Sequence, residues 1–306
     1  MLRSLMKAKC RWYSVVYYLT SLEHKKLINR LLPQARNVGV SPDLRGYSWH
    51  SEPLKPYYDV KIPMYAVCGK YCKSGRDVYL KLVEGERGEA THVVSLGTAV
   101  HDAVHGLYTT IRQAVWDLSF STWWSRTSFE TTLTGNVDSI RGCAERCWDF
   151  VKMNAHSRYA STLSEQPYAS DDDALFTSVP FMVEHKISGE LLGLSGILSL
   201  DCYDYLHNIV FDLKIAAKPQ EFHRLYPTGY ALVFESVHEV PIDVGCTVYV
   251  NFKNDRMLVD RDLFVITDDL RSWWIEERDT KAAIVAERRD PGKAPECGNC
   301  LYRSVC

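Results

Sequence analysis

The heptapeptide that runs from Ile209 to Ile215, Ile-Val-Phe-Asp-Leu-Lys-Ile, constrains the fold of this chain more than any other segment. Its β-branched and aromatic residues predict a strand, in which successive side chains point to opposite faces of a sheet. Asp212 and Lys214 then share one face of an otherwise apolar strand. Burying a carboxylate and an ammonium group is costly unless a partner compensates them. A metal ion bound to Asp212 would do so, and a surface ion pair between the two residues is the simpler alternative.

A second carboxylate follows the preceding β-rich run. The runs 196–201 and 209–215 are separated by a polar turn, which predicts a β-hairpin that brings Asp201 close to Asp212. Asp204 lies in the same turn region, and we prefer Asp201 because it directly ends the predicted strand. Two carboxylates and water oxygens suit Mg²⁺ or Mn²⁺, and the lysine of the second strand can orient or deprotonate an attacking water.

The periodicity along the rest of the chain predicts an α/β protein with a mixed sheet. The expected elements are a helix that begins after Thr20 and ends at Pro33, an irregular arm over 34–64, a helix over 96–115, a polar loop over 161–173, a helix over 219–235 bent at Pro227, strands over 247–252 and 263–266, and a helix over 270–289.

Composition places the chain among globular proteins with a substantial core. Of its 306 residues, 46% are hydrophobic and 24% are charged, which excludes a disordered chain. A net charge of -2 argues against a uniformly basic nucleic-acid binder, although it allows a local basic groove. The most apolar early stretch, 12–19, is far shorter than the roughly 20 residues that span a bilayer. It also lacks the features of an export signal, so we expect a cytoplasmic protein with reduced thiols.

Ten cysteines are many for a reduced protein, and three of them, Cys297, Cys300 and Cys306, lie at the end of the chain. Their spacing supplies three thiolates for zinc or for an iron-sulfur cluster and does not distinguish the two. Cys72 is the candidate fourth ligand, with Cys68 close by. The others form a rival pair on a predicted helix and three isolated residues expected to be buried: Cys143 and Cys147, and Cys10, Cys202 and Cys246.

The order of the polar groups resembles the RecB-like branch of the PD-(D/E)xK nucleases. His101 lies in a predicted helix, Asp201 and the Asp212-x-Lys214 triplet follow in strands, and Tyr230 lies in a later helix. Taken singly, His101 and Tyr230 also suit ordinary core or surface positions. The resemblance implies a restriction endonuclease-like core in which the lysine activates water and the tyrosine completes the site. The implied metal ligands are His101, Asp201, Asp212 and the carbonyl oxygen of Leu213.

One upstream cysteine and three C-terminal cysteines around such a core are similar to the iron-sulfur CRISPR-associated nucleases, and within them to the archaeal type I-A adaptation branch. The matching segments lie within residues 45–306 and include Tyr71-Cys72, Gly229-Tyr230-Ala231-Leu232 and Asp290-Pro291-Gly292. The resemblance implies that Cys72, Cys297, Cys300 and Cys306 hold a 4Fe-4S cluster.

The same resemblance implies three regions and a function. The regions are an N-terminal arm with the first cluster cysteine, 1–95, a RecB-like nuclease core, 96–290, and a cluster-binding segment, 291–306. We expect a Mg²⁺- or Mn²⁺-dependent exonuclease for single-stranded DNA ends or flaps that prepares DNA for CRISPR spacer acquisition. The expected partners are the CRISPR integrase and its small partner subunit.

Two departures from the family pattern favour a rival function. Position 212 carries Asp where the family usually has Glu, and the Gln that often precedes the helical tyrosine is absent. The rival is a catalytically weak scaffold that keeps the fold and the cluster and binds DNA or the integrase.

Overall fold

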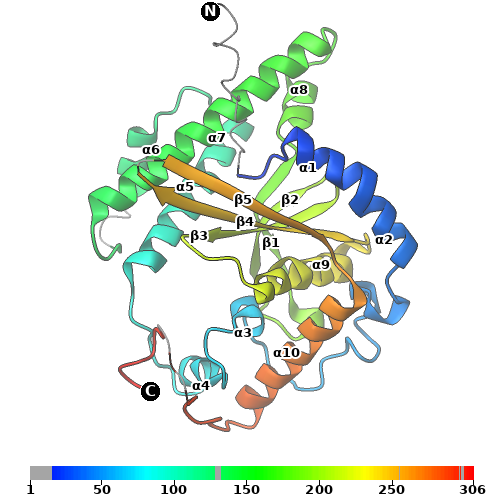
Figure 1. The fold of residues 1–306 in the computed structure, drawn as a ribbon, viewed down its shortest axis with the longest axis vertical. Coiled ribbons are helices and arrows are strands. Elements are labelled where there is room, and N and C mark those ends of the chain that lie inside the picture. The colour runs from blue at the N-terminus through cyan, green and yellow to red at the C-terminus, as the bar shows by residue number, and fades with distance from the viewer. Residues whose placement is uncertain (1–15, 128–131, 255, 296, 298–299) are drawn as a thin grey trace, which may run out of the picture.

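The computed structural model describes residues 16–127, 132–254, 256–295, 297 and 300–306, and it has a mixed five-stranded sheet with helices on both faces (Figure 1). The strands are β1 (Phe181–Ile187), β2 (Leu198–Asp204), β3 (Ile209–Ile215), β4 (Val244–Lys253) and β5 (Arg256–Val265). The α-helices are α1 (Ser21–Lys26), α2 (Leu32–Val38), α3 (Met64–Cys68), α4 (Arg76–Leu82), α5 (His92–Arg112), α6 (Phe120–Thr127), α7 (Val137–Glu165), α8 (Asp171–Ser178), α9 (Leu225–His238) and α10 (Asp268–Ala286).

The strands lie in the order β1-β2-β3-β4-β5. Antiparallel pairs join β1 to β2, β2 to β3 and β4 to β5, whereas β3 and β4 run parallel. A parallel pair needs a crossover connection, and α9 supplies it between β3 and β4. The hairpin of β2 and β3 and the mixed sheet are therefore confirmed.

The alternation predicted for β3 is also confirmed, because its two faces contribute to different hydrophobic clusters. Ile209, Phe211, Leu213 and Ile215 pack in a cluster that includes the buried sides of α5 and α7. Val210 packs on the opposite face, in a cluster that includes buried residues of α3, α9 and α10. Asp212 and Lys214 thus lie on the same face of β3 as Val210, in line with the apolar residues of that face.

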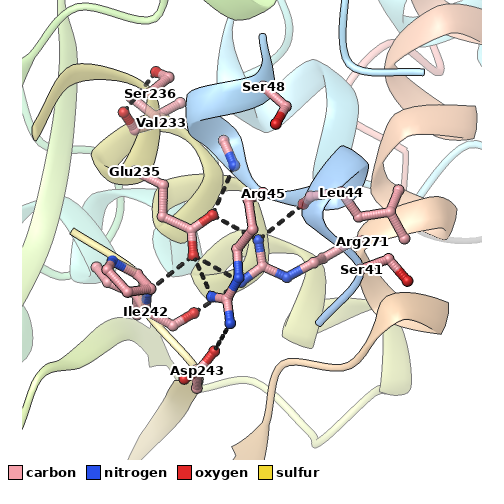
Figure 2. A network of polar contacts seen from close by, with 12 residues as sticks. Ser41, Leu44, Arg45, Ser48, Val233, Glu235, Ser236, Ile242, Asp243 and Arg271 are labelled. Carbon is pink, nitrogen blue, oxygen red and sulfur yellow. Dashed lines mark hydrogen bonds and ion pairs between the residues drawn. The ribbon is translucent and has the colours of Figure 1, made fainter. Parts of the chain in front are cut away.

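The N-terminal part of the chain contributes to both layers. Residues 16–35 join the cluster beside α5 and α7, whereas residues 44–68 join the cluster beside α9 and α10. A buried network of ion pairs and hydrogen bonds joins the second of these segments, 44–68, to α9 and α10, as Figure 2 shows. Glu235 of α9 is fully buried and accepts hydrogen bonds from Arg45, Gly46 and Arg271. The arm between α2 and α3 is therefore joined to α9 and α10.

Several boundaries differ from the sequence-based expectations. Pro33 does not end the first helix, because the chain stays helical from α1 through a π-helical turn, Leu27–Leu31, into α2, and Pro33 lies just after that turn. Pro227 lies in the first turn of α9. Most of the expected loop at 161–173 is helical, because α7 continues to Glu165 and α8 begins at Asp171.

The capping box of Thr20 and Glu23 is confirmed at the start of α1. Among the described segments, no helix is both long enough and apolar enough to cross a membrane.

Candidate active site

One cavity of about 320 Å³ contains every residue that the sequence singled out for catalysis. Its polar lining comes from α5, from β2 and β3, and from α9, so three separate parts of the chain meet there. The residues in question are His101, Asp201, Asp212, Leu213, Lys214 and Tyr230. Residues that are far apart in the sequence therefore lie together at a single site.

Two carboxylates meet between β1 and β2. The register pairs Val183 with Cys202 and His185 with Leu200, which places Glu184 opposite Asp201. Glu184 has a φ of 50°, an uncommon left-handed conformation for a residue without a glycine's freedom. Like charges directly opposite each other destabilise a sheet unless a cation lies between them. Strain and repulsion at one position are typical of a functional site.

His101 completes this group from above the sheet. One ligand atom from each of His101, Glu184 and Asp201 lies within 4.8 Å of the other two, the separation that a single metal ion requires. His101 Nδ1 is 3.7 Å from Glu184 Oε1 and 3.9 Å from Asp201 Oδ1. On its other side, Nε2 lies 3.1 Å from the carbonyl oxygen of Leu213.

The carboxylates control the protonation of this histidine. Burial alone would lower the pKa of His101, but Asp201 and Glu184 outweigh it and raise the pKa to about 9. The pKa of Asp201 is raised to about 6, chiefly by burial and also by the negative charges of Asp212 and Glu184. Without a metal, protonated His101 is therefore the positive charge that offsets the two carboxylates. A bound metal ion would replace this charge, and His101 would then lose its proton.

Asp212 and Lys214 form a buried pair on the second face of β3. Lys214 Nζ lies 3.0 Å from both carboxylate oxygens of Asp212, but only Oδ1 accepts a hydrogen bond in good geometry. Asp212 Oδ2 is buried, and the groups that the structure describes offer it no hydrogen-bond partner. An orphaned carboxylate oxygen inside the cavity, beside the His-Glu-Asp group, fits a divalent cation that prefers oxygen ligands.

Lys214 lies against the aromatic ring of Tyr226, with 3.4 Å between Nζ and the ring centroid. Burial alone would lower its pKa, but Asp212 and Asp201 outweigh burial, and the pKa is raised. Lys214 is therefore an ammonium ion, which can hold a water molecule or a phosphate oxygen in place.

Tyr230 lines the same cavity, where its hydroxyl group donates a hydrogen bond of 2.6 Å to the carbonyl oxygen of Ser199. The sequence reasoning missed Glu184 and Tyr226. Glu184 lies in a strand that the reasoning did not predict, and only the register of β1 on β2 reveals its partner. Tyr226 lies within the helix predicted over 219–235, but the periodicity of that helix does not show that the Tyr226 ring contacts the lysine.

Three of the four implied cluster cysteines, Cys72, Cys300 and Cys306, lie in neighbouring segments around α4, near enough for their charges to affect one another. The pKa of Cys300 is raised, chiefly by burial, and the charges of Cys72 and Cys306 raise it further. Arg76 of α4 donates to Cys306 through Nη1, which is 3.4 Å from Sγ and 3.1 Å from the carbonyl oxygen. Figure 1 shows the C-terminus beside α4.

Cys72 and Cys300 also have hydrogen-bond donors beside their sulfurs, which favour the thiolate form. Burial alone would raise the pKa of Cys72, but hydrogen bonds from the Ser74 hydroxyl and the Asp77 amide outweigh it and lower the pKa. The amide of Tyr302 lies 3.4 Å from Cys300 Sγ. Donors around sulfur are the usual surroundings of thiolates that hold a cluster, so Cys72, Cys300 and Cys306 fit such a group.

The remaining cysteines lie elsewhere. Cys297 is exposed, and its sulfur faces the carbonyl oxygen of Ala294 at 3.7 Å. Cys68 is fully buried in the core beside α9 and α10. Cys202 and Cys246 are fully buried, as predicted, and Cys10 lies outside the described residues. The rival pair on α7 is buried in the core: Cys143 and Cys147.

The chain is similar to known proteins over almost its whole length. The family model of the CRISPR-associated exonuclease Csa1 matches residues 18–306. The chain is 29% identical over 290 residues to the CRISPR-associated exonuclease Csa1 of Thermoproteus tenax, and the alignment covers 94% of this chain and 99% of that protein. It is 30% identical over 300 residues to the protein of the same name from Saccharolobus solfataricus, with the same coverage. The chain therefore belongs to the Csa1 family of CRISPR-associated exonucleases.

Proposed function

We propose that this protein is a divalent-metal-dependent exonuclease that hydrolyses single-stranded DNA at ends or flaps. The names of its relatives support a nuclease role in CRISPR defence. The observation that carries the proposal is the convergence of His101, Glu184 and Asp201 within 4.8 Å, next to the Asp212 oxygen that accepts no hydrogen bond among the described groups. Mg²⁺ and Mn²⁺ suit this set of ligands, which is mostly carboxylate.

Hydrolysis adds the oxygen of water to phosphorus, breaks the bond between phosphorus and the leaving oxygen, and delivers a proton to that oxygen. A divalent ion held by His101, Glu184, Asp201 and Asp212 would polarise the phosphate and lower the pKa of a bound water. Lys214 is a fixed ammonium group in a buried setting, so it orients the water and stabilises the negative charge that develops on phosphate. Tyr226 and Asp212 hold that ammonium group in place.

We also propose that a 4Fe-4S cluster is bound by Cys72, Cys297, Cys300 and Cys306. The cluster would join the loop before α4 to the end of the chain. The hydrogen bonds to sulfur around Cys72, Cys300 and Cys306 support this assignment. The proposed biological role is the trimming of DNA for spacer acquisition, beside the CRISPR integrase and its small partner subunit.

The decisive experiment is a nuclease assay with 5′- and 3′-labelled single strands in the presence of Mg²⁺ or Mn²⁺. The wild type should shorten the strand from an end, and EDTA should stop the reaction. Asp212→Ala should abolish cleavage and leave the brown colour of the cluster unchanged, and Lys214→Ala should slow cleavage strongly. Cleavage at the wild-type rate by Asp212→Ala would overturn the site. DNA binding without any cleavage by the wild type would favour the scaffold instead.

A further inference from the structure

The cavity of the proposed active site has a second wall with a different chemistry. It is formed by the start of α3 and by the segment that precedes β2: Pro63, Met64, Tyr65, Ser195, Ile197 and Leu198. Two of these side chains are large and exposed, with 44% of Tyr65 and 78% of Ile197 open to solvent. An aromatic ring and a nearly bare isoleucine therefore stand beside the metal-binding group.

Backbone hydrogen bonds hold the two parts of this wall together. The amide of Ile62 donates to the carbonyl oxygen of Gly193 at 3.2 Å, and the amide of Ser195 donates to the carbonyl oxygen of Ile62 at 3.0 Å. Ile62 and Leu194 pair as an isolated β-bridge, and both are fully buried. The spacing between the two exposed side chains is therefore fixed by a bonded backbone.

The ring of Tyr65 also has a neighbour of its own. The ammonium group of Lys81 lies 4.1 Å from the ring centroid, a cation-π contact, and the side chain of Tyr65 lines the cavity. Ile197 has no comparable cover, so about four-fifths of a purely apolar side chain remains in water. Leaving such a side chain exposed beside a charged site is unfavourable, and contact with an apolar ligand surface would relieve the cost.

We propose that Tyr65 and Ile197 receive an unpaired nucleobase of the strand whose phosphate is cleaved, and that they thereby select single-stranded ends. This inference rests on the proposed function. Every base has a π-face that can stack on an aromatic ring, whatever the sequence. A paired base offers its faces only to its neighbours in the duplex, so it must be unpaired and unstacked before it can contact another surface. A cavity of about 320 Å³ suits one nucleotide and not a base pair.

Binding of DNA to rim variants tests this inference. The probe is a single-stranded 12-mer with 2-aminopurine at its end, compared with the duplex of the same sequence, in EDTA so that nothing is cut. Tyr65→Ala and Ile197→Ser should each weaken binding of the single strand roughly tenfold and reduce the quenching of 2-aminopurine. Binding of the duplex should change less than twofold.

Two controls accompany the variants. Tyr65→Phe keeps the ring and should bind like the wild type. Leu206→Ser alters an equally apolar, 55% exposed side chain in the turn between β2 and β3, and should have no effect. Both rim residues are exposed, so thermal unfolding of the variants should match the wild type.

The outcomes separate this inference from the proposed function. Equal weakening of single-strand and duplex binding, or no weakening, would overturn the inference while the nuclease assay still stands. A wild type that neither binds nor cuts either form of DNA would overturn the proposed function and the inference together.

Discussion

The main-chain amide of Leu213 donates a hydrogen bond of 2.7 Å to Asp201 Oδ2, so a proposed metal ligand also joins two strands. The regular pairing of β2 with β3 ends at Cys202 and Phe211, immediately before this contact. The carboxylate therefore replaces a ladder hydrogen bond at the point where the strands separate. Its other oxygen faces His101. Substitutions of Asp201 should consequently change both the stability of the sheet and the binding of the metal ion.

Two substitutions at Asp201 separate these roles. Asp201→Asn keeps an oxygen that accepts the Leu213 amide and removes one negative charge from a repulsive group, so we expect stability without metal at or above that of the wild type. Asp201→Ala leaves the amide unpaired and should cost about 1–3 kcal/mol. Both variants should lose the stabilisation that Mn²⁺ gives the wild type. Thermal unfolding with and without Mn²⁺ measures this, and a full Mn²⁺ shift in Asp201→Asn would exclude Asp201 as a ligand.

Glu184 should be as important as the acids that the sequence revealed. Glu184→Gln removes a charge that lies within ligand distance of His101 and Asp201, so we expect cleavage to fall at least tenfold and the affinity for Mn²⁺ to fall with it. Glu190→Gln is the matched control, because Glu190 follows the same strand but is half exposed in an ion pair with Lys61. Isothermal titration with Mn²⁺ compares the two. Equal affinities in both variants would remove Glu184 from the site.

Lys214 and Asp212 should depend on each other for stability. Lys214→Met leaves a carboxylate that is 4% exposed without its cation, which should cost about 3 kcal/mol. The double variant Asp212→Asn/Lys214→Met removes both charges and should recover most of that loss. Urea unfolding of the two single variants and the double variant gives the coupling energy. Additive losses would show that the pair is not coupled.

The sequence predicted the core of the site because its chemistry is concentrated in one short strand. Asp212 and Lys214 interrupt an apolar run, and alternation alone assigns them to one face. The hairpin with β2 then brings Asp201 close. These are local relationships, which periodicity and turn signals can reveal.

Contacts that depend on the pairing of distant segments could not be predicted in this way. Glu184 joins the site through the register of β1, a strand in which apolar and polar residues do not alternate regularly and one residue has a positive φ. Tyr226 lies beside Lys214 because the first turn of α9 passes over β3, and helical periodicity does not reveal that position. The network around Glu235 unites three segments that are far apart in the sequence.

The network in Figure 2 should make the fold sensitive to acid. Burial alone would raise the pKa of Glu235, but hydrogen bonds and charge from Arg271 outweigh it and lower the pKa. A lowered pKa means that this carboxylate stabilises the fold above its unfolded pKa of about 4.3, and that the contribution is lost as the pH falls through the folded value.

At pH 7 the free energy of unfolding of Glu235→Gln should therefore be about 3 kcal/mol lower than that of the wild type, because the buried guanidinium of Arg271 loses its carboxylate partner. The difference should begin to shrink below about pH 4.3, where the unfolded wild type takes up a proton, and should be lost once the pH falls below the lowered pKa of folded Glu235. Glu239→Gln, in an exposed residue at the end of α9, is the control. Urea unfolding of the variants and the wild type at pH 7 and below about pH 4 checks this. A difference in the free energy of unfolding that does not change with pH would contradict it.

Arg76 should determine whether the proposed cluster is retained. Its Nε and Nη2 donate to Asp290 at 3.0 and 2.9 Å, and its Nη1 donates to Cys306, so it fixes the last residue against α4. Arg76→Ala should lower the iron and sulfide content of anaerobically purified protein and shorten the lifetime of the absorbance near 400 nm in air several-fold, because a ligand loses both its support and a hydrogen bond to sulfur. Arg303→Ala, an exposed change in the same segment, should retain the wild-type content. Equal iron in both variants would show that Arg76 does not position Cys306, and zinc in place of iron in the wild type would exclude the cluster itself.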